Sequence, residues 1–192
     1  MVAVPSATSL PTGVAGVKDS GCNCHGAVVS DSVVPILEGL PETYNYSEVY
    51  TLTIGFTGGP ADPSNINQGG FNLWVSDGEI TPSDAAVQSW NPNEVSHTDA
   101  GNDQTMWSVD WIAPSNDRNV EFILHTNSVN GNAGSGEGTL GDEWNRLSIQ
   151  VASPTVLLEQ ANPYTVLTTL ILVSFVLLLT VLIFIFYQNN PD

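Results

Sequence analysis

Short runs of alternating apolar and polar residues recur between residues 30 and 152, and this pattern restricts the chain to few folds. A period of two is typical of strands that have one buried face. Gly, Pro and Asn residues separate the runs, and no amphipathic helical period occurs in this region. About 120 residues can bury one core, so we predict an all-β domain of two packed sheets. The clearest runs are Tyr50–Phe56, Phe71–Val75, Trp107–Trp111, Val120–Leu124 and Leu147–Val151.

A different pattern occupies the C-terminal part of the chain. From Val166 to Tyr187 no residue is charged, and the run is long enough to cross a bilayer core as one helix. Tyr164 and Tyr187 fit the aromatic belts of the two membrane interfaces. A helix in a soluble core rarely stays apolar on every face. We therefore expect a leader (1–29), a β-sandwich domain (30–152), a linker (153–163), a transmembrane helix (164–187) and a tail (188–192).

The charge of the chain restricts its partners and its compartment. Twenty acidic residues stand against three basic ones, which gives a formal net charge of −17. No basic patch is available for nucleic acid, so we expect no nucleic-acid partner. Residues 1–20 contain no secretory signal, whereas residues 4–13 resemble the low-complexity stretch that follows a cleaved one. We expect a single-pass protein of the cell membrane with an extracytoplasmic N-terminal domain; a tail-anchored cytoplasmic domain is the alternative.

The chemistry of the chain is concentrated in Cys22-Asn23-Cys24-His25, which holds both cysteines and one of the three histidines. A c-type haem site normally reads Cys-x-x-Cys-His, so this motif is one residue shorter. We expect haem c to be bound through Cys22, Cys24 and His25. Copper or another metal ion is an alternative, because thiolates beside an imidazole suit copper better than zinc. A redox-labile disulfide or a thiol pair is the remaining alternative.

A haem iron or a metal ion in this motif would take a further ligand from elsewhere in the chain. The candidates are His97, His125 and Met106. His97 is the preferred candidate, because it lies in a polar stretch that we expect to be a loop; His25 and His97 are then the expected metal ligands. We expect His97 to approach the Cys22–His25 segment in space. His125 is expected to be half-exposed on a strand, and Met106 to lie in the core.

Several motifs together resemble a known family. In order, the chain has the cysteine-rich segment, Gly39-Leu40-Pro41, Gly69-Gly70-Phe71, Ser96-His97-Thr98-Asp99-Ala100-Gly101, Trp107-x-x-x-Trp111-x-Ala113-Pro114 and Gly141-Asp142. Over roughly residues 12–152 this order resembles the prokaryotic choice-of-anchor V domain. The resemblance implies an immunoglobulin-like, Reeler-like sandwich preceded by a haem-like cysteine–histidine motif and followed by a variable anchor. The shortened cysteine spacing is a departure from that pattern.

No motif of hydrolytic or nucleotide chemistry is present, so we do not expect an enzyme. The motifs predict an exported, membrane-anchored sandwich that transfers electrons at the outer membrane face and meets a redox partner protein. The alternative is a cell-surface adhesion module that binds a surface ligand, in which the motif only holds a metal or forms a disulfide. The Gly-rich loop 127–144 is read as a plain hairpin loop, with calcium binding as the less favoured interpretation.

Overall fold

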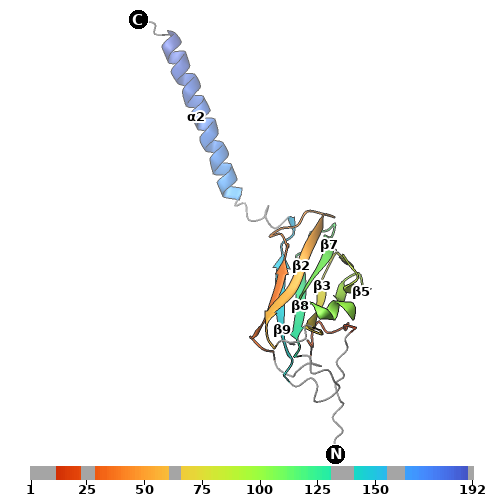
Figure 1. Ribbon diagram of the computed structural model, residues 1–192. Helices are drawn as coiled ribbons and strands as arrows, with labels where there is room; N and C mark the ends of the chain where they lie inside the picture. The colour runs from red at the N-terminus through yellow and green to blue at the C-terminus, as the bar shows by residue number, and fades with distance from the viewer. Residues whose placement is uncertain (1–11, 23–28, 61–65, 131–140, 155–162, 190–192) are drawn as a thin grey trace, which may run out of the picture. The chain divides into compact units, whose positions relative to one another are not determined.

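The computed structural model describes residues 12–22, 29–60, 66–130, 141–154 and 163–189. The chain divides into two units, Met1–Ser153 and Pro154–Asp192. Within the described residues, the first unit contains two antiparallel sheets packed face to face (Figure 1). One sheet has the strand order β1-β2-β7-β4 and the other has the order β5-β6-β3-β8-β9. The predicted all-β, two-sheet domain is confirmed.

The strands are short and joined by turns, with one 3-10 helix, η2, between β6 and β7. Their bounds are β1 Val33–Glu38, β2 Val49–Gly58, β3 Gly69–Val75, β4 Glu79–Pro82, β5 Val87–Asn91, β6 Glu94–His97, η2 Ala100–Asp103, β7 Met106–Ile112, β8 Val120–Ser128 and β9 Glu143–Val151.

The core lies between the two sheets, and the alternation in the sequence determines which side chains enter it. In β7, Trp107, Val109 and Trp111 point inward, whereas the residues between them are less buried. Trp111 is fully buried, and its ring meets Tyr44 and Phe122 edge to face at 5.8 and 4.9 Å between centroids. Such aromatic contacts add to the burial of apolar area that stabilises the domain. The buried face of β7 is therefore the one that the alternating run Trp107–Trp111 predicts.

The central strands β3 and β8 of the five-stranded sheet are largely buried on both faces, whereas the edge strand β9 is exposed on its outer face. Phe122 and Leu124 of β8 face the core, but Ile123 and His125 on the opposite face are equally buried. Residues 12–22 cover this second face, through contacts that are described below. We expected these residues to be part of a low-complexity leader outside the domain. The structure instead packs them against the sheet.

The second unit contains the helix α2, Pro163–Asn189. Its described apolar side chains, such as Leu170, Phe175 and Leu179, are exposed. Among the described residues, the chain therefore has one C-terminal helix in addition to its two sheets. Within the part of the chain that the structure describes, no helix is both long enough and apolar enough to cross a membrane.

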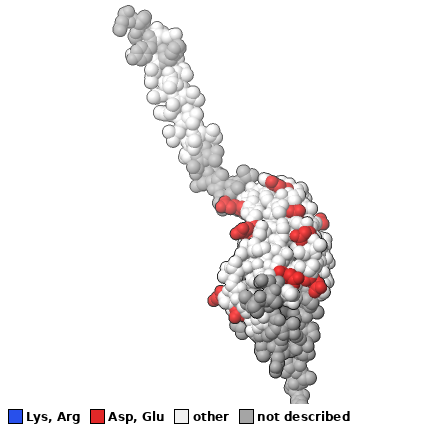
Figure 2. Space-filling view, in the orientation of Figure 1, with Lys and Arg blue, Asp and Glu red and all other residues white. Residues whose placement is uncertain are grey.

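The surface of the domain is acidic. Figure 2 shows Asp and Glu side chains spread over the visible face of the described part, without Lys or Arg among the residues drawn there. Among the described residues, one ion pair is found, between Lys18 Nζ and Asp19 at 3.9 Å. The acidic groups thus have few cationic partners, and their mutual repulsion is relieved mainly by dissolved ions.

Candidate functional site

The cysteine–histidine motif begins on the covered face of the five-stranded sheet. Cys22 is buried, with 7% of its surface exposed. Asn23, Cys24 and His25 lie outside the described residues. Among the described residues, no group of three or more His, Cys, Asp and Glu side chains could hold a metal ion. The predicted site is therefore described only from Cys22 and from the sheet beneath it.

Polar contacts fix the segment before Cys22 on the sheet. The backbone N–H of Gly16 donates to Oε1 of Glu94 at 2.7 Å, and Nδ2 of Asn72 donates to the same oxygen at 2.9 Å. Asn72 Nδ2 also donates to the carbonyl oxygen of Val14 at 2.8 Å. Charge-assisted hydrogen bonds of this kind are stronger than neutral ones, so Glu94 is a main attachment point for the segment.

The end of the segment packs against a tryptophan of β9. Gly21 has a positive φ of 71°, and a Cβ built on it would lie 2.2 Å from Cη2 of Trp144. This close approach requires glycine. Beyond the undescribed residues the chain returns to the same place, because Val29 forms an isolated bridge with Trp144 and Ser30 N–H donates to its carbonyl oxygen at 2.9 Å. Both flanks of residues 23–28 are therefore attached at Trp144.

Trp144 connects this segment to a buried histidine. Its ring lies 5.8 Å from the ring of His125, measured between centroids. His125 is 1% exposed, and its Nδ1 has no hydrogen-bond partner among the described residues. Burial, and to a smaller extent the charge of Arg146, its register partner on β9, lowers the pKa of His125 from 6.5 to about 4. The imidazole is therefore neutral at pH 7, which is the form that binds metals.

His97, the preferred ligand in the sequence, lies in a different environment. Its ring contacts Phe71 and Trp107 of the core, at 6.3 and 6.4 Å between centroids. Its Nδ1 accepts a hydrogen bond from the backbone N–H of Phe71 at 3.1 Å. The structure thus places His97 against core aromatics, whereas Gly21, the residue before Cys22, packs on Trp144, whose ring lies near His125. The ligand role of His97 remains a prediction.

The other expectations for this region have different outcomes. The stretch around His97 is not the expected loop, because Glu94–His97 forms strand β6 and all four residues are buried. His125 was expected to be half-exposed and is buried. Met106 was expected in the core but is 41% exposed, because it alternates with the inward-pointing Trp107.

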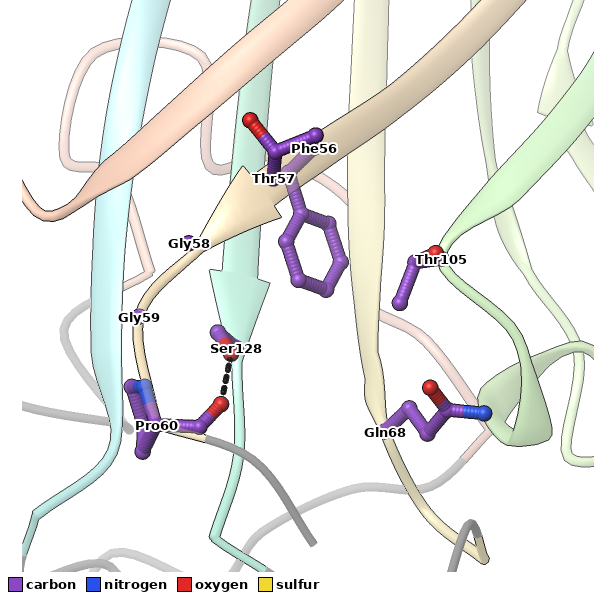
Figure 3. Close-up of a pocket in the computed structure, with 8 residues that line it drawn as sticks. All are labelled: Phe56, Thr57, Gly58, Gly59, Pro60, Gln68, Thr105 and Ser128. Atoms are coloured by element: carbon purple, nitrogen blue, oxygen red, sulfur yellow. Dashed lines mark hydrogen bonds between the residues drawn. The ribbon is translucent and has the colours of Figure 1, made fainter.

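A second feature is an open pocket of about 340 Å³ at one end of the sandwich, where β2 and β8 end (Figure 3). Two of its lining residues are joined by a hydrogen bond, in which Ser128 Oγ donates to the carbonyl oxygen of Pro60 (Figure 3). The side chains lining it carry no charge, so it offers shape and hydrogen bonds but no group for acid–base chemistry. Its lining residues are Phe56, Thr57, Gly58, Gly59, Pro60, Gln68, Thr105 and Ser128.

Sequence reasoning did not identify Asn72, Glu94 and Trp144 as residues of the site. Each stands at an outward position of a strand, where polar and aromatic residues are common on a solvated face. The only signal in the sequence was Gly13, Gly16 and Gly21 in the preceding segment, since glycine permits backbone to approach a sheet closely.

Comparison with known proteins gives structural neighbours only. No family model matches the sequence, and comparison with the curated proteins gives no significant match. The Reelin-N domain of F-spondin is 18% identical, with 65% of this chain and 88% of that chain covered and a TM-score of 0.42. The reeler domain of human F-spondin is 20% identical, with 65% and 91% covered and a TM-score of 0.40.

A third neighbour is the collagen-binding domain from a Staphylococcus aureus adhesin, at 8% identity, 63% and 98% coverage and a TM-score of 0.31. Similarities this low carry no argument about function. The strand pairing itself defines the class: the chain is a mostly β protein of two antiparallel sheets with one C-terminal helix.

Proposed function

We propose that this protein is a membrane-anchored, extracytoplasmic electron-transfer protein whose redox group is held by the Cys22–His25 segment. The observation that carries the proposal is the burial of Cys22 on a sheet face that also holds a neutral, buried imidazole, His125. A segment that served only as a spacer would not need this attachment, because polar low-complexity chain is stable in water. We further propose kinship with the choice-of-anchor V domain.

The donor chemistry of the segment is compatible with haem or with copper. In the haem form, Cys22 and Cys24 would form the thioether links and His25 would ligate the iron. In the copper form, the same thiols and imidazole would bind the ion directly. Either group would supply one-electron chemistry, while the chain holds it, limits water access and sets its potential. Haem is our first choice, and copper is the alternative.

Membrane anchoring is the second part of the proposal, and the sequence supports it. Residues 166–187 are uncharged in the sequence, and as a helix this run of 22 residues would extend about 33 Å, enough for a hydrocarbon core of about 30 Å. The exposed side chains of α2, including Leu172 and Phe186, would face lipid. We expect the full chain to resist extraction from membranes by alkaline carbonate. Leu177→Arg with Leu178→Arg should release it, whereas Leu177→Ile with Leu178→Ile should not.

The redox proposal is tested on the full chain, produced in a host that exports it and matures c-type cytochromes. A visible spectrum and an intact mass are measured for the wild type and for Cys22→Ala, together with metal analysis. Haem bands with a covalent mass increase that Cys22→Ala abolishes would support the haem form, and bound copper lost in the same variant would support the copper form. A colourless protein without metal would overturn the proposal in favour of the surface adhesion module.

A further inference from the structure

The turn before strand β2 carries a sequence triplet that the proposed redox chemistry does not use. Asn45-Tyr46-Ser47 is the only place in the chain where asparagine is followed, after one residue other than proline, by serine or threonine. This is the acceptor pattern for attachment of a sugar to the amide nitrogen of asparagine. The pattern is usable where the triplet lies on an exposed loop of an exported protein.

All three residues of the triplet lie in an exposed, tight turn. The backbone N–H of Glu48 donates to the carbonyl oxygen of Asn45 at 3.2 Å, which closes a β-turn with Tyr46 and Ser47 at its centre. Tyr46 is 48% exposed, and Asn45 and Ser47 are exposed as well. Strand β2 begins at Val49, so the triplet lies outside the sheet. An enzyme can therefore reach Asn45 in the folded protein.

Ser47 stands at a backbone position that serine seldom occupies. Its φ is 58°, in the left-handed region where glycine and asparagine are usual. The other non-glycine residue with a positive φ in the described part of the chain, Asn67, is of the usual type. The Ser47 hydroxyl makes no hydrogen bond to the described residues, so the turn itself does not require a serine. The acceptor pattern does require a hydroxyl at this position, which gives the serine a reason.

The side chain of Asn45 is oriented without being blocked. Its Nδ2 donates to Oε2 of Glu48, and its backbone N–H donates to the Tyr50 hydroxyl at 2.8 Å. An amide nitrogen carries two hydrogens, so one can keep its bond to Glu48 while a sugar replaces the other. The turn therefore holds the acceptor nitrogen at the surface in a form that attachment of a sugar leaves intact.

We propose that Asn45 is a site of N-glycosylation, whose donor is an oligosaccharide carried on a lipid-linked phosphate or diphosphate. A bond forms between Asn45 Nδ2 and the anomeric carbon of the first sugar, and the bond from that carbon to the phosphate oxygen breaks. The amide gives one proton to a base of the transferase, and the lipid phosphate is the leaving group. This inference rests on the extracytoplasmic location in the proposed function, and it does not depend on the redox group.

The sugar would stand far from the cysteine–histidine motif. Thr43 bridges Ala152, whereas Val29, on the flank of the motif, bridges Trp144. These two positions lie at opposite ends of β9, and at about 3.3 Å a residue they are about 26 Å apart along the strand. A sugar on Asn45 therefore leaves the Cys22 segment uncovered, and the spectrum of any bound redox group should be the same with and without it.

The test begins with the full chain isolated from the membranes of its native cells. Peptide mapping should place an oligosaccharide on Asn45, and an amidase that removes N-linked sugars should leave aspartate there. Asn45→Gln and Tyr46→Pro, produced in the same cells, should both lack the sugar. Proline between the two acceptor residues blocks the pattern but suits the second position of a β-turn, so Tyr46→Pro keeps the fold. Ser115→Ala, at an exposed serine outside the triplet, should keep the sugar.

Ser47→Ala and Ser47→Gly separate the role of the hydroxyl from that of the fold. Both remove the hydroxyl, so both should lack the sugar. Ser47→Gly should unfold at the higher temperature, because glycine adopts a φ of 58° without strain and alanine does not. A sugar that is lost in Ser47→Ala but kept in Ser47→Gly would overturn the inference, because the loss would then follow stability.

A protease added to intact protoplasts locates the domain independently. A domain that is cleaved from outside, but whose Asn45 carries no sugar, would overturn this inference and leave the proposed function standing. A domain that is protected until the protoplasts are lysed would overturn the proposed location and this inference with it.

Discussion

The buried imidazole of His125 makes the stability of the metal-free protein depend on pH. In the folded state burial, and then the charge of Arg146, lowers the pKa to about 4, whereas an unfolded chain has a histidine pKa of 6.5. Above pH 6.5 the imidazole is neutral in both states, and its full contribution to stability is present. Between pH 6.5 and 4 only the unfolded chain binds the proton, so stability falls as the pH decreases; below pH 4 the loss levels off.

The size of this loss follows from the difference between the two pKa values. At 1.36 kcal/mol for each pH unit, the interval from 6.5 to about 4 corresponds to about 3 kcal/mol. This is a substantial part of the 5–15 kcal/mol that is usual for a domain, at about 20% or more. Because His125 is 1% exposed, solvent screening reduces the figure little.

Chemical denaturation of the full chain between pH 4 and pH 8 measures the effect, with His125→Gln as the reference. Twenty acidic residues also titrate in this range, but they are common to both proteins, so the difference in unfolding free energy isolates the histidine. We expect the wild type to lose about 3 kcal/mol relative to the variant between pH 7 and pH 4. A difference that stays constant across this range would refute the reasoning that His125 is buried and neutral.

Three further predictions concern the segment, the core and the surface. Gly21→Ala should destabilise the domain by about 1–3 kcal/mol more than Gly16→Ala in thermal unfolding. Both glycines have a positive φ, but only Gly21 lies against Trp144. Equal losses of stability would contradict this packing. Trp111→Ala should lower the free energy of unfolding in urea by about 3–5 kcal/mol, and Trp90→Ala should lower it far less, because Trp90 is 46% exposed. A larger loss for Trp90→Ala than for Trp111→Ala would contradict the position of the core. Raising the ionic strength from about 0.01 to about 1 M should increase the unfolding free energy, because it screens a net charge of −17; a decrease would count against net repulsion.

The sequence predicted strands well where one face of a sheet meets solvent. β7 is the clearest case, because Trp107, Val109 and Trp111 alternate with more exposed residues in both the sequence and the structure. The alternation of apolar and polar residues did not predict β6, because the polar residues Glu94 and Ser96 favour a loop in the sequence. Their side chains are buried because residues 12–22 cover that face, and a period-two pattern cannot reveal a cover supplied by a distant segment.

The candidate site shows the same limit more strongly. The sequence singled out Cys22 from its motif, but the sheet residues beneath it carry no motif of their own. Asn72 and His125 became neighbours only through the pairing of β3 with β8, over 53 positions of sequence between register partners. The polar stretch around His97 favoured that residue as a ligand, whereas the structure places its ring with Phe71 and Trp107.

The covered sheet face also bears on how the segment finds its position. Apolar contacts alone would specify the docking of residues 12–22 weakly, because dispersion has little directional preference. Glu94 and Asn72 accept and donate at fixed positions, so a shift of one residue would leave the Glu94 carboxylate buried without the Gly16 N–H. A buried carboxylate that loses a hydrogen bond is costly, and this penalty selects one register. The same register brings Gly21 to Trp144 and Cys22 to the buried face, so the polar residues that appear unfavourable in the sheet are what position the cysteine–histidine motif.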